Sequence, residues 1–187
     1  VSDIFRYACM KTEVFTPFVC GAFTTLFSKD AAVEALNEGK VVYDDLGGGK
    51  TTSLGITKDG VMVVGNYSVA DLKEKGVQEA VSFYPALIIS GNKTQISGDG
   101  GFGIAPKTAI GQRKDGAIIL LVIDGRDITS LGATVKEVQE IMYQLGALNA
   151  INLDGGKSTT MYYEGDIINK PSNSMGERTI ATAIIVK

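Results

Sequence analysis

The 187-residue sequence contains no histidine and only two cysteines. Without an imidazole, Ser-His-Asp and Cys-His catalysis are excluded, as is every zinc site that needs a histidine ligand. Two cysteines are too few for a four-cysteine zinc site or a disulfide framework. Cys9 and Cys20 therefore leave two alternatives open, one bridge or two buried free thiols, and the redox compartment stays undecided.

An excess of basic residues is also missing, because 18 Lys and Arg face 21 Asp and Glu, for a formal net charge of −3. Binding to nucleic acid depends on neutralising phosphates with such an excess, so we expect no nucleic-acid partner. The longest apolar run, 117–123, has seven residues, whereas a membrane helix needs about 20. Residues 1–20 lack the cationic start and long apolar run of a signal peptide, which suggests a mature product or a fragment.

Glycine, by contrast, is abundant, with 23 residues in the chain. This is well above the average content of about 7% and implies many tight turns or close backbone approaches. The glycines are spread over the whole length, and we find neither an internal repeat nor a domain boundary. The length suits one domain, so we expect residues 1–187 to form a single unit.

Three segments carry helical signals, at 30–37, 69–75 and 135–145. The first begins at an Asp30 cap and stops at Gly39. The other two begin at capping boxes and end at a glycine. The capping pairs are Ser68 with Asp71 and Thr134 with Glu137.

Strands account for most of the rest, and the expected fold class is α+β, a mixed sheet core with a few packed helices. A hairpin is predicted where the Asp59-Gly60 turn joins the strands 54–57 and 61–64. Other segments rich in Ile, Val and aromatic residues are predicted strands, at 86–89, 118–123, 150–153, 159–163 and 180–186. Residues 118–153 read as a strand, helix and strand crossover that places its two strands side by side.

The segments that follow the two crossover strands have similar residues, namely an aspartate, one or two glycines and a basic residue. One strand is followed by Asp124-Gly125-Arg126-Asp127 and the other by Asp154-Gly155-Gly156-Lys157-Ser158. Parallel strands end on the same sheet edge, where open sheets commonly bind ligands. The glycines would let backbone N–H groups approach an anion closely. For each segment alone, an ordinary Asp-Gly turn is the alternative.

Several ordered motifs in the second half resemble the phosphodiester glycosidase family. The resemblance covers about 85–187 and is carried by these segments: Pro106-Lys107-Thr108-Ala109-Ile110-Gly111, Val122-Ile123-Asp124-Gly125-Arg126, Gly132, Asn152-Leu153-Asp154-Gly155-Gly156-Lys157-Ser158, Asn169-Lys170-Pro171-Ser172 and Gly176-Glu177-Arg178. The chain departs from the family pattern at Lys107, where arginine is usual, and at Lys157, where a third glycine is usual. The segment 18–23 also lacks the asparagine of the family's Asn-Gly-Gly-Phe-like strand end.

The resemblance implies a hydrolase that cleaves between a sugar anomeric carbon and a phosphodiester oxygen, releasing free sugar and a phosphomonoester. It also implies a secreted or cell-surface location on a bacterium, and the expected substrates are microbial glycans or teichoic-acid-like polymers. A phosphate leaving group is a weak base, with a second pKa of about 6, so protonating it matters less than holding its charge. The site therefore needs a carboxylate near the anomeric carbon, together with cations and N–H donors.

Candidate residues fill each of these roles. Asp154 is the leading nucleophile or general base, with Asp124 and Glu177 as the other acids. The phosphate-binding candidates are Arg126, Arg178, Lys107, Lys157, Gly155, Gly156 and Ser158. Asn169 would bind a sugar hydroxyl, and Thr108 is either a ligand donor or the first residue of a strand.

Three alternatives stay open. A non-catalytic domain that binds glycans or phosphate polymers would explain the missing asparagine segment. We expect no resident cofactor, although Asp124, Asp127 and Asp154 offer oxygen ligands for a divalent cation. One of Tyr162 and Tyr163 could stack on a sugar, but core or surface positions in a strand are the simpler assignment for both.

Overall fold

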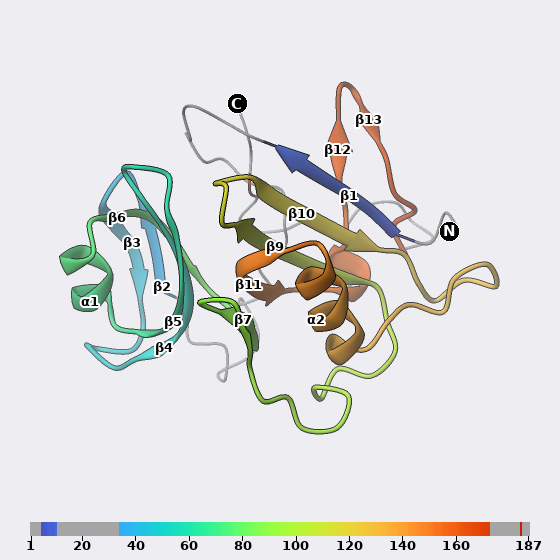
Figure 1. The fold of residues 1–187 in the computed structure, drawn as a ribbon, viewed down its shortest axis with the longest axis horizontal. Coiled ribbons are helices and arrows are strands. Elements are labelled where there is room, and N and C mark those ends of the chain that lie inside the picture. The colour runs from blue at the N-terminus through green and yellow to red at the C-terminus, as the bar shows by residue number, and fades with distance from the viewer. Residues whose placement is uncertain (1–4, 11–33, 173–183, 185–187) are drawn as a thin grey trace.

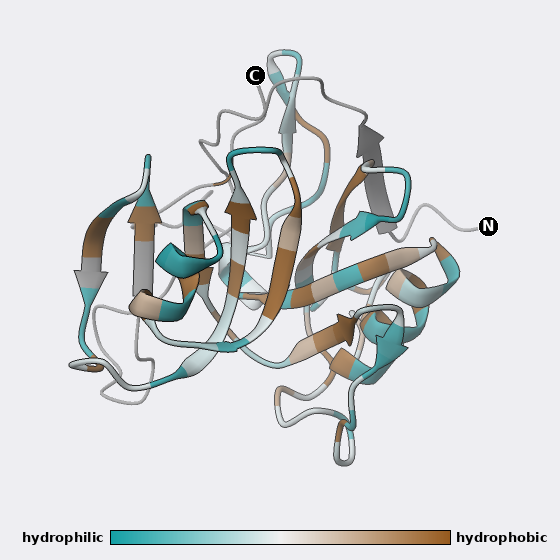
Figure 2. Ribbon diagram, turned by 60° about the vertical axis from the view of Figure 1, so that its left-hand side comes forward, coloured by the Kyte–Doolittle hydropathy of each residue, from teal (hydrophilic) through white to brown (hydrophobic). Residues whose placement is uncertain are grey.

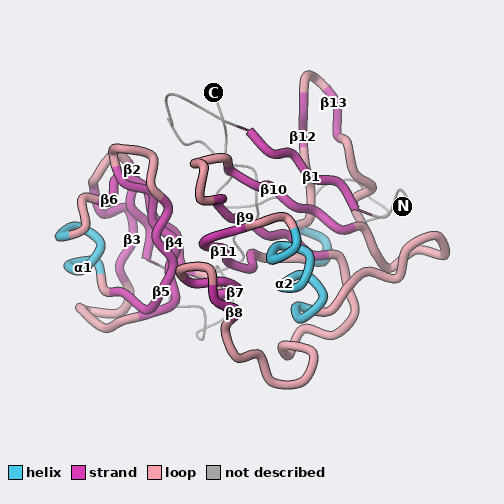
Figure 3. Tube along the Cα trace, in the orientation of Figure 1, coloured by secondary structure: helices cyan, strands magenta, loops and turns pink. Residues whose placement is uncertain are grey.

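The computed structural model describes residues 5–10, 34–172 and 184, which contain two large antiparallel sheets, a short hairpin and two α-helices (Figures 1 and 3). The fold class is thus α+β, but sheet dominates it. All strand pairs in this part of the chain are antiparallel, so the expected mixed sheet is not found. None of the helices described is long and apolar enough to cross a bilayer.

The first sheet has five strands in the order β3-β2-β6-β4-β5. Its elements are β2 (Glu34–Asn37), β3 (Lys40–Asp44), β4 (Thr51–Thr57), β5 (Met62–Tyr67) and β6 (Val77–Ser82), with α1 (Val69–Glu74) between β5 and β6. The predicted hairpin is confirmed, because β4 pairs with β5 across a turn in which Gly60 has a φ of 74°. The capping box of α1 is also present.

The second sheet has six strands in the order β1-β10-β9-β11-β7-β8. Its strands are β1 (Phe5–Met10), β7 (Ala86–Ile89), β8 (Asn92–Lys93), β9 (Lys107–Arg113), β10 (Ile118–Ile123) and β11 (Ala147–Leu153). Helix α2 (Val135–Gln144) connects β10 to β11, with its predicted capping box in place. A 3-10 turn, η1 (Gly156–Ser158), and the hairpin of β12 (Tyr162–Tyr163) and β13 (Asp166–Ile167) follow.

The central strands β9, β10 and β11 of the six-stranded sheet are buried on both faces, which explains their continuous apolar residues. In β10, Ile119 and Leu121 join the core formed with α2, whereas Ile118 and Leu120 pack on the opposite side against residues of β4 and β5. Because side chains alternate along a strand, one apolar run fills both layers. Hydrophobic residues accordingly concentrate on the strands of both sheets (Figure 2).

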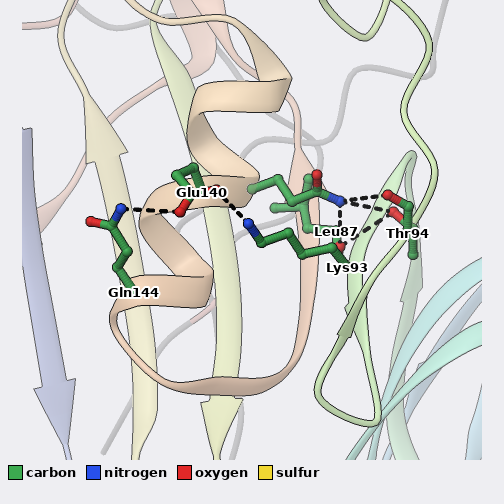
Figure 4. Close-up of polar contacts among 6 residues, drawn as sticks. Leu87, Lys93, Thr94, Glu140 and Gln144 are labelled. Carbon is green, nitrogen blue, oxygen red and sulfur yellow. Dashed lines mark hydrogen bonds and ion pairs between the residues drawn. The ribbon is translucent and has the colours of Figure 1, made fainter.

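Helix α2 is anchored to β7 and β8 by polar contacts at its surface (Figure 4). The buried Gln139 side chain donates to the carbonyls of Leu87 and Thr94 at 2.8 and 2.9 Å. Lys93 forms an ion pair with Glu140 of the helix. These bonds fix the helix over one face of the sheet and thereby set the path of the segments that lead into and out of it.

Polar side chains also join the two sheets. Gln112 of β9 accepts from the Met62 N–H at 2.7 Å and donates to the Gly60 carbonyl at 2.8 Å. Asn149 of β11 donates to the Met62 carbonyl at 2.9 Å. Both main-chain polar groups of Met62 are therefore satisfied by the neighbouring sheet, in a region that is otherwise apolar.

We expect Gln112→Ala to lower the free energy of unfolding by about 2 kcal/mol, because it leaves the buried Met62 N–H without an acceptor. Urea unfolding followed by circular dichroism measures this change. Gln144→Ala is the matched control, since its exposed bond to Glu140 within α2 should contribute about 0.5 kcal/mol or less. Equal losses in the two variants would contradict a bridging role for Gln112.

Three sequence predictions need correction. Residues 34–37 form strand β2 rather than part of a helix over 30–37, because Glu38 and Gly39 adopt φ values of 50° and 72° and turn the chain into β3. The crossover strands β10 and β11 are not neighbours, since β9 lies between them and pairs with both. Of the predicted strand 159–163, only Tyr162–Tyr163 is strand. Apart from residue 184, the predicted strand 180–186 lies outside the described residues.

Candidate active site

Asp124 and Asp154 directly follow strands β10 and β11. Both strands end on the same side of the six-stranded sheet, and this row of strand ends is called the sheet edge below. Each strand is antiparallel to β9, so the two run parallel to each other. Thr108 of β9 lies opposite both Val122 of β10 and Leu153 of β11. The two strands therefore end at nearly the same position along β9. With strands about 4.8 Å apart, the main chains leading to the two acids are separated by roughly 10 Å.

Asp124 is held in place by the segment that follows the β12–β13 hairpin. Its Oδ1 atom accepts from the Asn169 side-chain amide at 3.0 Å and from the Lys170 backbone N–H at 2.9 Å. The same amide donates to the Thr159 carbonyl, and its oxygen accepts from the Met161 N–H. Asn169 thus uses its amide groups to position Asp124, which leaves little capacity for the sugar hydroxyl expected from the sequence.

Asp127 lies beside this bond network. Its carboxylate accepts from the Lys170 ammonium at 2.6 Å and from the backbone N–H and hydroxyl of Thr129. These contacts, that of Lys170 first, hold the pKa of Asp127 well below its usual range. Within residues 5–10, 34–172 and 184, no group of three or more His, Cys, Asp or Glu side chains is placed to hold a metal ion.

Lys107, the first residue of β9, lies between the two acidic strand ends and is only 3% exposed. Its ammonium donates to the carbonyls of Gly103 and Ala105 at 3.0 and 3.2 Å. Burial, and next the positive charge of Arg126, lower the pKa of Lys107 to about 8. Two cations held close together inside a protein repel each other, and a bound anion would relieve that repulsion.

Arg126 brings the loop after β10 against the loop after β11. Its Nη1 atom lies 3.3 Å from the position that a Cβ atom on Gly156 would occupy. Arg126 also has a φ of 61°, a left-handed conformation that non-glycine residues seldom adopt. Such strain persists where the surrounding structure enforces it, and it is frequent at functional sites.

The glycines of both loops allow close packing of the backbone, whereas the sequence suggested that they let backbone N–H groups approach an anion. A Cβ atom on Gly125 would lie 2.8 Å from the Pro106 nitrogen, and one on Gly155 would lie 2.4 Å from the Pro106 oxygen. The N–H of Gly156 donates to that same oxygen at 2.9 Å. These glycines therefore let the two loops pack on the Pro106 backbone, and the Gly156 N–H is already bonded within the protein.

The remaining candidates occupy varied positions. The buried hydroxyl of Thr108 bonds to Thr159, which ties β9 to the segment after η1. In η1 itself Ser158 is buried and Lys157 is exposed. Glu177 and Arg178 lie outside the described residues, as do Cys20 and the segment 18–23.

Lys170 was not among the candidate residues, although it lies in the Asn169-Lys170-Pro171-Ser172 segment. Its backbone bonds Asp124 and its side chain bonds Asp127, so it contributes twice to the acidic loop. A lysine beside a proline after a short hairpin has ordinary turn composition. Only the three-dimensional path of the chain, which returns to β10 more than 40 residues later, identifies this contact.

Comparison with known proteins gives consistent matches. Residues 19–187 match the family described as phosphodiester glycosidase. The chain is 27% identical over 170 residues to the mouse N-acetylglucosamine-1-phosphodiester alpha-N-acetylglucosaminidase, a match covering 82% of the chain and 32% of the mouse protein. The human protein of the same name is 32% identical over 158 residues, covering 72% of the chain and 30% of that protein. The chain thus spans about a third of the length of these relatives.

Among solved structures, the chain is similar to the catalytic domain of the zebrafish N-acetylglucosamine-1-phosphodiester alpha-N-acetylglucosaminidase, described as auto-inhibited by its pro-peptide. The TM-score is 0.69 at 26% identity, over 90% of this chain and 61% of the zebrafish chain. A hypothetical protein from Synechocystis gives a TM-score of 0.51 at 28% identity, over 66% of this chain and 24% of the other.

Proposed function

Since the chain belongs to the phosphodiester glycosidase family, we propose that it hydrolyses sugar-1-phosphodiesters at the anomeric carbon. The bond from that carbon to the phosphodiester oxygen breaks, and the oxygen leaves with the electron pair. A water oxygen bonds to the carbon and loses its proton, which gives a free sugar and a phosphomonoester. The observation that supports this proposal most is the shared sheet edge, where Asp124 and Asp154 flank a buried lysine.

In the proposed reaction Asp154 acts at the anomeric carbon, as nucleophile or as the base that activates water. Lys107 and Arg126 hold the phosphate and stabilise the negative charge that grows on it as the bond breaks. Asp124 serves as the second acid of the site, positioned by Asn169. Glu177 and Arg178 keep the roles assigned from the sequence, as a further acid and a further phosphate-binding group.

The names of the mouse and human relatives make an α-N-acetylglucosaminyl phosphodiester the first substrate to test. We expect incubation with the methyl phosphodiester of α-N-acetylglucosamine 1-phosphate to release reducing sugar and methyl phosphate in equal amounts. A reducing-sugar assay measures the sugar, and phosphorus NMR measures the methyl phosphate. Saturable binding without turnover would instead favour the non-catalytic glycan-binding alternative. Absence of both would contradict the proposal.

The lowered pKa of Lys107 predicts how phosphate affinity changes with pH. Below about pH 8 the side chain is protonated and attracts phosphate, and above that value it becomes neutral. We expect inorganic phosphate to bind roughly tenfold more weakly at pH 9 than at pH 7, given the usual strength of charged hydrogen bonds. Isothermal titration calorimetry measures the two affinities.

The matched control for this experiment is Lys107→Arg, because a guanidinium stays charged over the whole range. Phosphate itself titrates near neutral pH, so the comparison of the two proteins isolates the lysine. The phosphate affinity of the wild type should fall between pH 7 and pH 9, and that of the arginine variant should not. Parallel profiles for the two proteins would show that Lys107 does not contact the anion.

A further inference from the structure

Three aromatic rings from two distant segments of the chain lie together. The Phe83 and Tyr84 rings stack with centroids 5.7 Å apart. The Phe102 ring lies 5.2 Å from the Tyr84 ring and 6.3 Å from the Phe83 ring. Each ring therefore contacts the other two, which fixes their orientation more firmly than isolated surface side chains would be fixed.

The first of these segments is bonded to the strand that ends at Asp154. Asn152, two residues before that acid, donates from its side chain to the Tyr84 carbonyl at 2.9 Å. Its backbone N–H donates to the Pro85 carbonyl at 3.1 Å. Continuing this antiparallel pairing by one residue places Tyr84 opposite Leu153, one strand spacing from the residue that precedes Asp154.

The second segment is bonded to the cation of the site. Lys107 donates to the carbonyl of Gly103, the residue that directly follows Phe102. One ring is thus tied through the backbone to the acid-bearing strand and another to the buried lysine. The cluster occupies the Asp154 side of the sheet edge, whereas Asp127 and its Lys170 partner are bonded on the Asp124 side.

Exposure differs among the three rings in a way that suits a binding surface. Phe83 is partly buried and packs against the core between the two sheets. Tyr84 and Phe102 remain 53% and 38% exposed although they are large and apolar. Two exposed rings packed against a partly buried one form an apolar patch, and such patches commonly mark ligand or partner sites.

We propose that Tyr84 and Phe102 stack on the pyranose ring of the substrate and so place its anomeric carbon at Asp154. This inference rests on the proposed function for the position of the reacting carbon. One face of a pyranose presents C–H hydrogens with slight positive charge, which complement the negative face of an aromatic ring. The phosphate would then extend from the sugar toward Lys107 and Arg126.

This cluster is a better stacking surface than the Tyr162 and Tyr163 pair considered from the sequence. Those two residues are neighbours in β12, so their side chains point to opposite faces of the hairpin. At most one of them can face a given ligand. Tyr84 and Phe102 share a single cluster. The Tyr84 carbonyl accepts from Asn152, two residues before Asp154, and the carbonyl of Gly103, next to Phe102, accepts from Lys107.

The test compares two probes by isothermal titration calorimetry, α-N-acetylglucosamine 1-phosphate and inorganic phosphate. We expect Tyr84→Ala and Phe102→Ala each to weaken sugar-phosphate binding about tenfold while leaving phosphate binding unchanged. Tyr84→Phe should bind as the wild type does, because stacking needs the ring and not the hydroxyl. Tyr84→Leu, which keeps apolar volume without a π face, should behave as the alanine variant and serves if that variant does not fold.

Tyr143→Ala is the control, since this exposed tyrosine lies on α2 over Lys93 and should leave both affinities unchanged. Unaltered sugar-phosphate binding in the Tyr84 and Phe102 variants, an equal loss for both probes, or no binding of the sugar phosphate by the wild type would overturn the proposal. The outcome is independent of turnover. Ring-dependent binding without hydrolysis would refute the proposed function alone, whereas hydrolysis with unaltered binding in the variants would refute the stacking surface alone.

Discussion

Asp154→Asn is expected to lower the rate of sugar release by at least about a thousandfold, because the amide can neither attack the anomeric carbon nor take a proton from water. The substitution changes the size of the side chain very little, so the strand end should keep its path. Steady-state assays with the methyl phosphodiester give the rate. Binding of the sugar phosphate should persist, since the groups that hold the phosphate are still present.

Asp166→Asn is the matched control for this variant. It makes the same chemical change at an exposed position of the β12–β13 hairpin, and it should retain wild-type activity. Circular dichroism establishes that both variants are folded. Undiminished release by Asp154→Asn would remove this residue from the mechanism, and comparable losses in the two variants would point to a general effect on structure.

Gly132→Ala is expected to lower the free energy of unfolding by about 3 kcal/mol or more. Gly132 has a φ of 107°, and a Cβ atom there would lie 2.4 Å from the carbonyl carbon of Ala105. The added methyl group would strain the backbone and also push apart the bridge between Ala105 and Ala133, whose two hydrogen bonds are 3.0 and 3.2 Å long. Both costs, for left-handed backbone and for overpacking, are of order 1–3 kcal/mol.

Gly116→Ala separates the two costs. Gly116 has a φ of 87°, but nothing lies within 4 Å of its added Cβ atom. The free energy of unfolding should therefore fall by only about 1 kcal/mol in this variant. Urea unfolding of both proteins gives the comparison. Because the Ala105 segment leads directly into Lys107, Gly132→Ala should also impair phosphate binding. Equal stability of the two variants would contradict the close backbone packing described for this loop.

Local signals in the sequence predicted both described helices correctly. The capping boxes of α1 and α2 are formed as expected, because each involves residues only three positions apart. The helix over 30–37 failed for the converse reason. Its alanine and leucine content favours helix locally, but residues 34–37 pair with β3 and β6, and such tertiary pairing overrides weak propensity.

Strand order could not be read from local pattern, and several strands were missing from the prediction, namely β1, β2, β3, β6, β8, β9 and β13. Of these, β9 matters most for the site, and the sequence indicated it only as one alternative for Thr108. Strand β9 has Gly111 one residue from its centre, and glycine weakens strand propensity. The structure explains the glycine, since a Cβ atom there would lie 2.6 Å from Met142 of α2 and 2.8 Å from the Asn149 carbonyl. The position that obscures the strand in the sequence is the one that lets the helix and the neighbouring strand approach it.

For the candidate site, the sequence predicted that Asp124 and Asp154 follow strands ending on the same side of the sheet, but not how Asp124 is held. Asp124 and Asp154 share a sheet edge because β10 and β11 run parallel to each other. This remains true although β9 lies between them, since β9 is antiparallel to both. The positioning role of Asn169 and the packing role of Gly125 and Gly155 depend on contacts between segments far apart in the chain. No spacing rule in the sequence reports such contacts.

Hydrolysis in ¹⁸O-labelled water tests the proposed chemistry most directly, because it reveals which bond to the bridging oxygen is broken. Attack at the anomeric carbon by an acid at this sheet edge, with the phosphate as leaving group, predicts that mass spectrometry finds the label in the released sugar and none in the methyl phosphate. A brief incubation followed by reduction of the sugar prevents exchange of the label at the anomeric carbon. Label in the methyl phosphate would mean attack at phosphorus and would contradict the account.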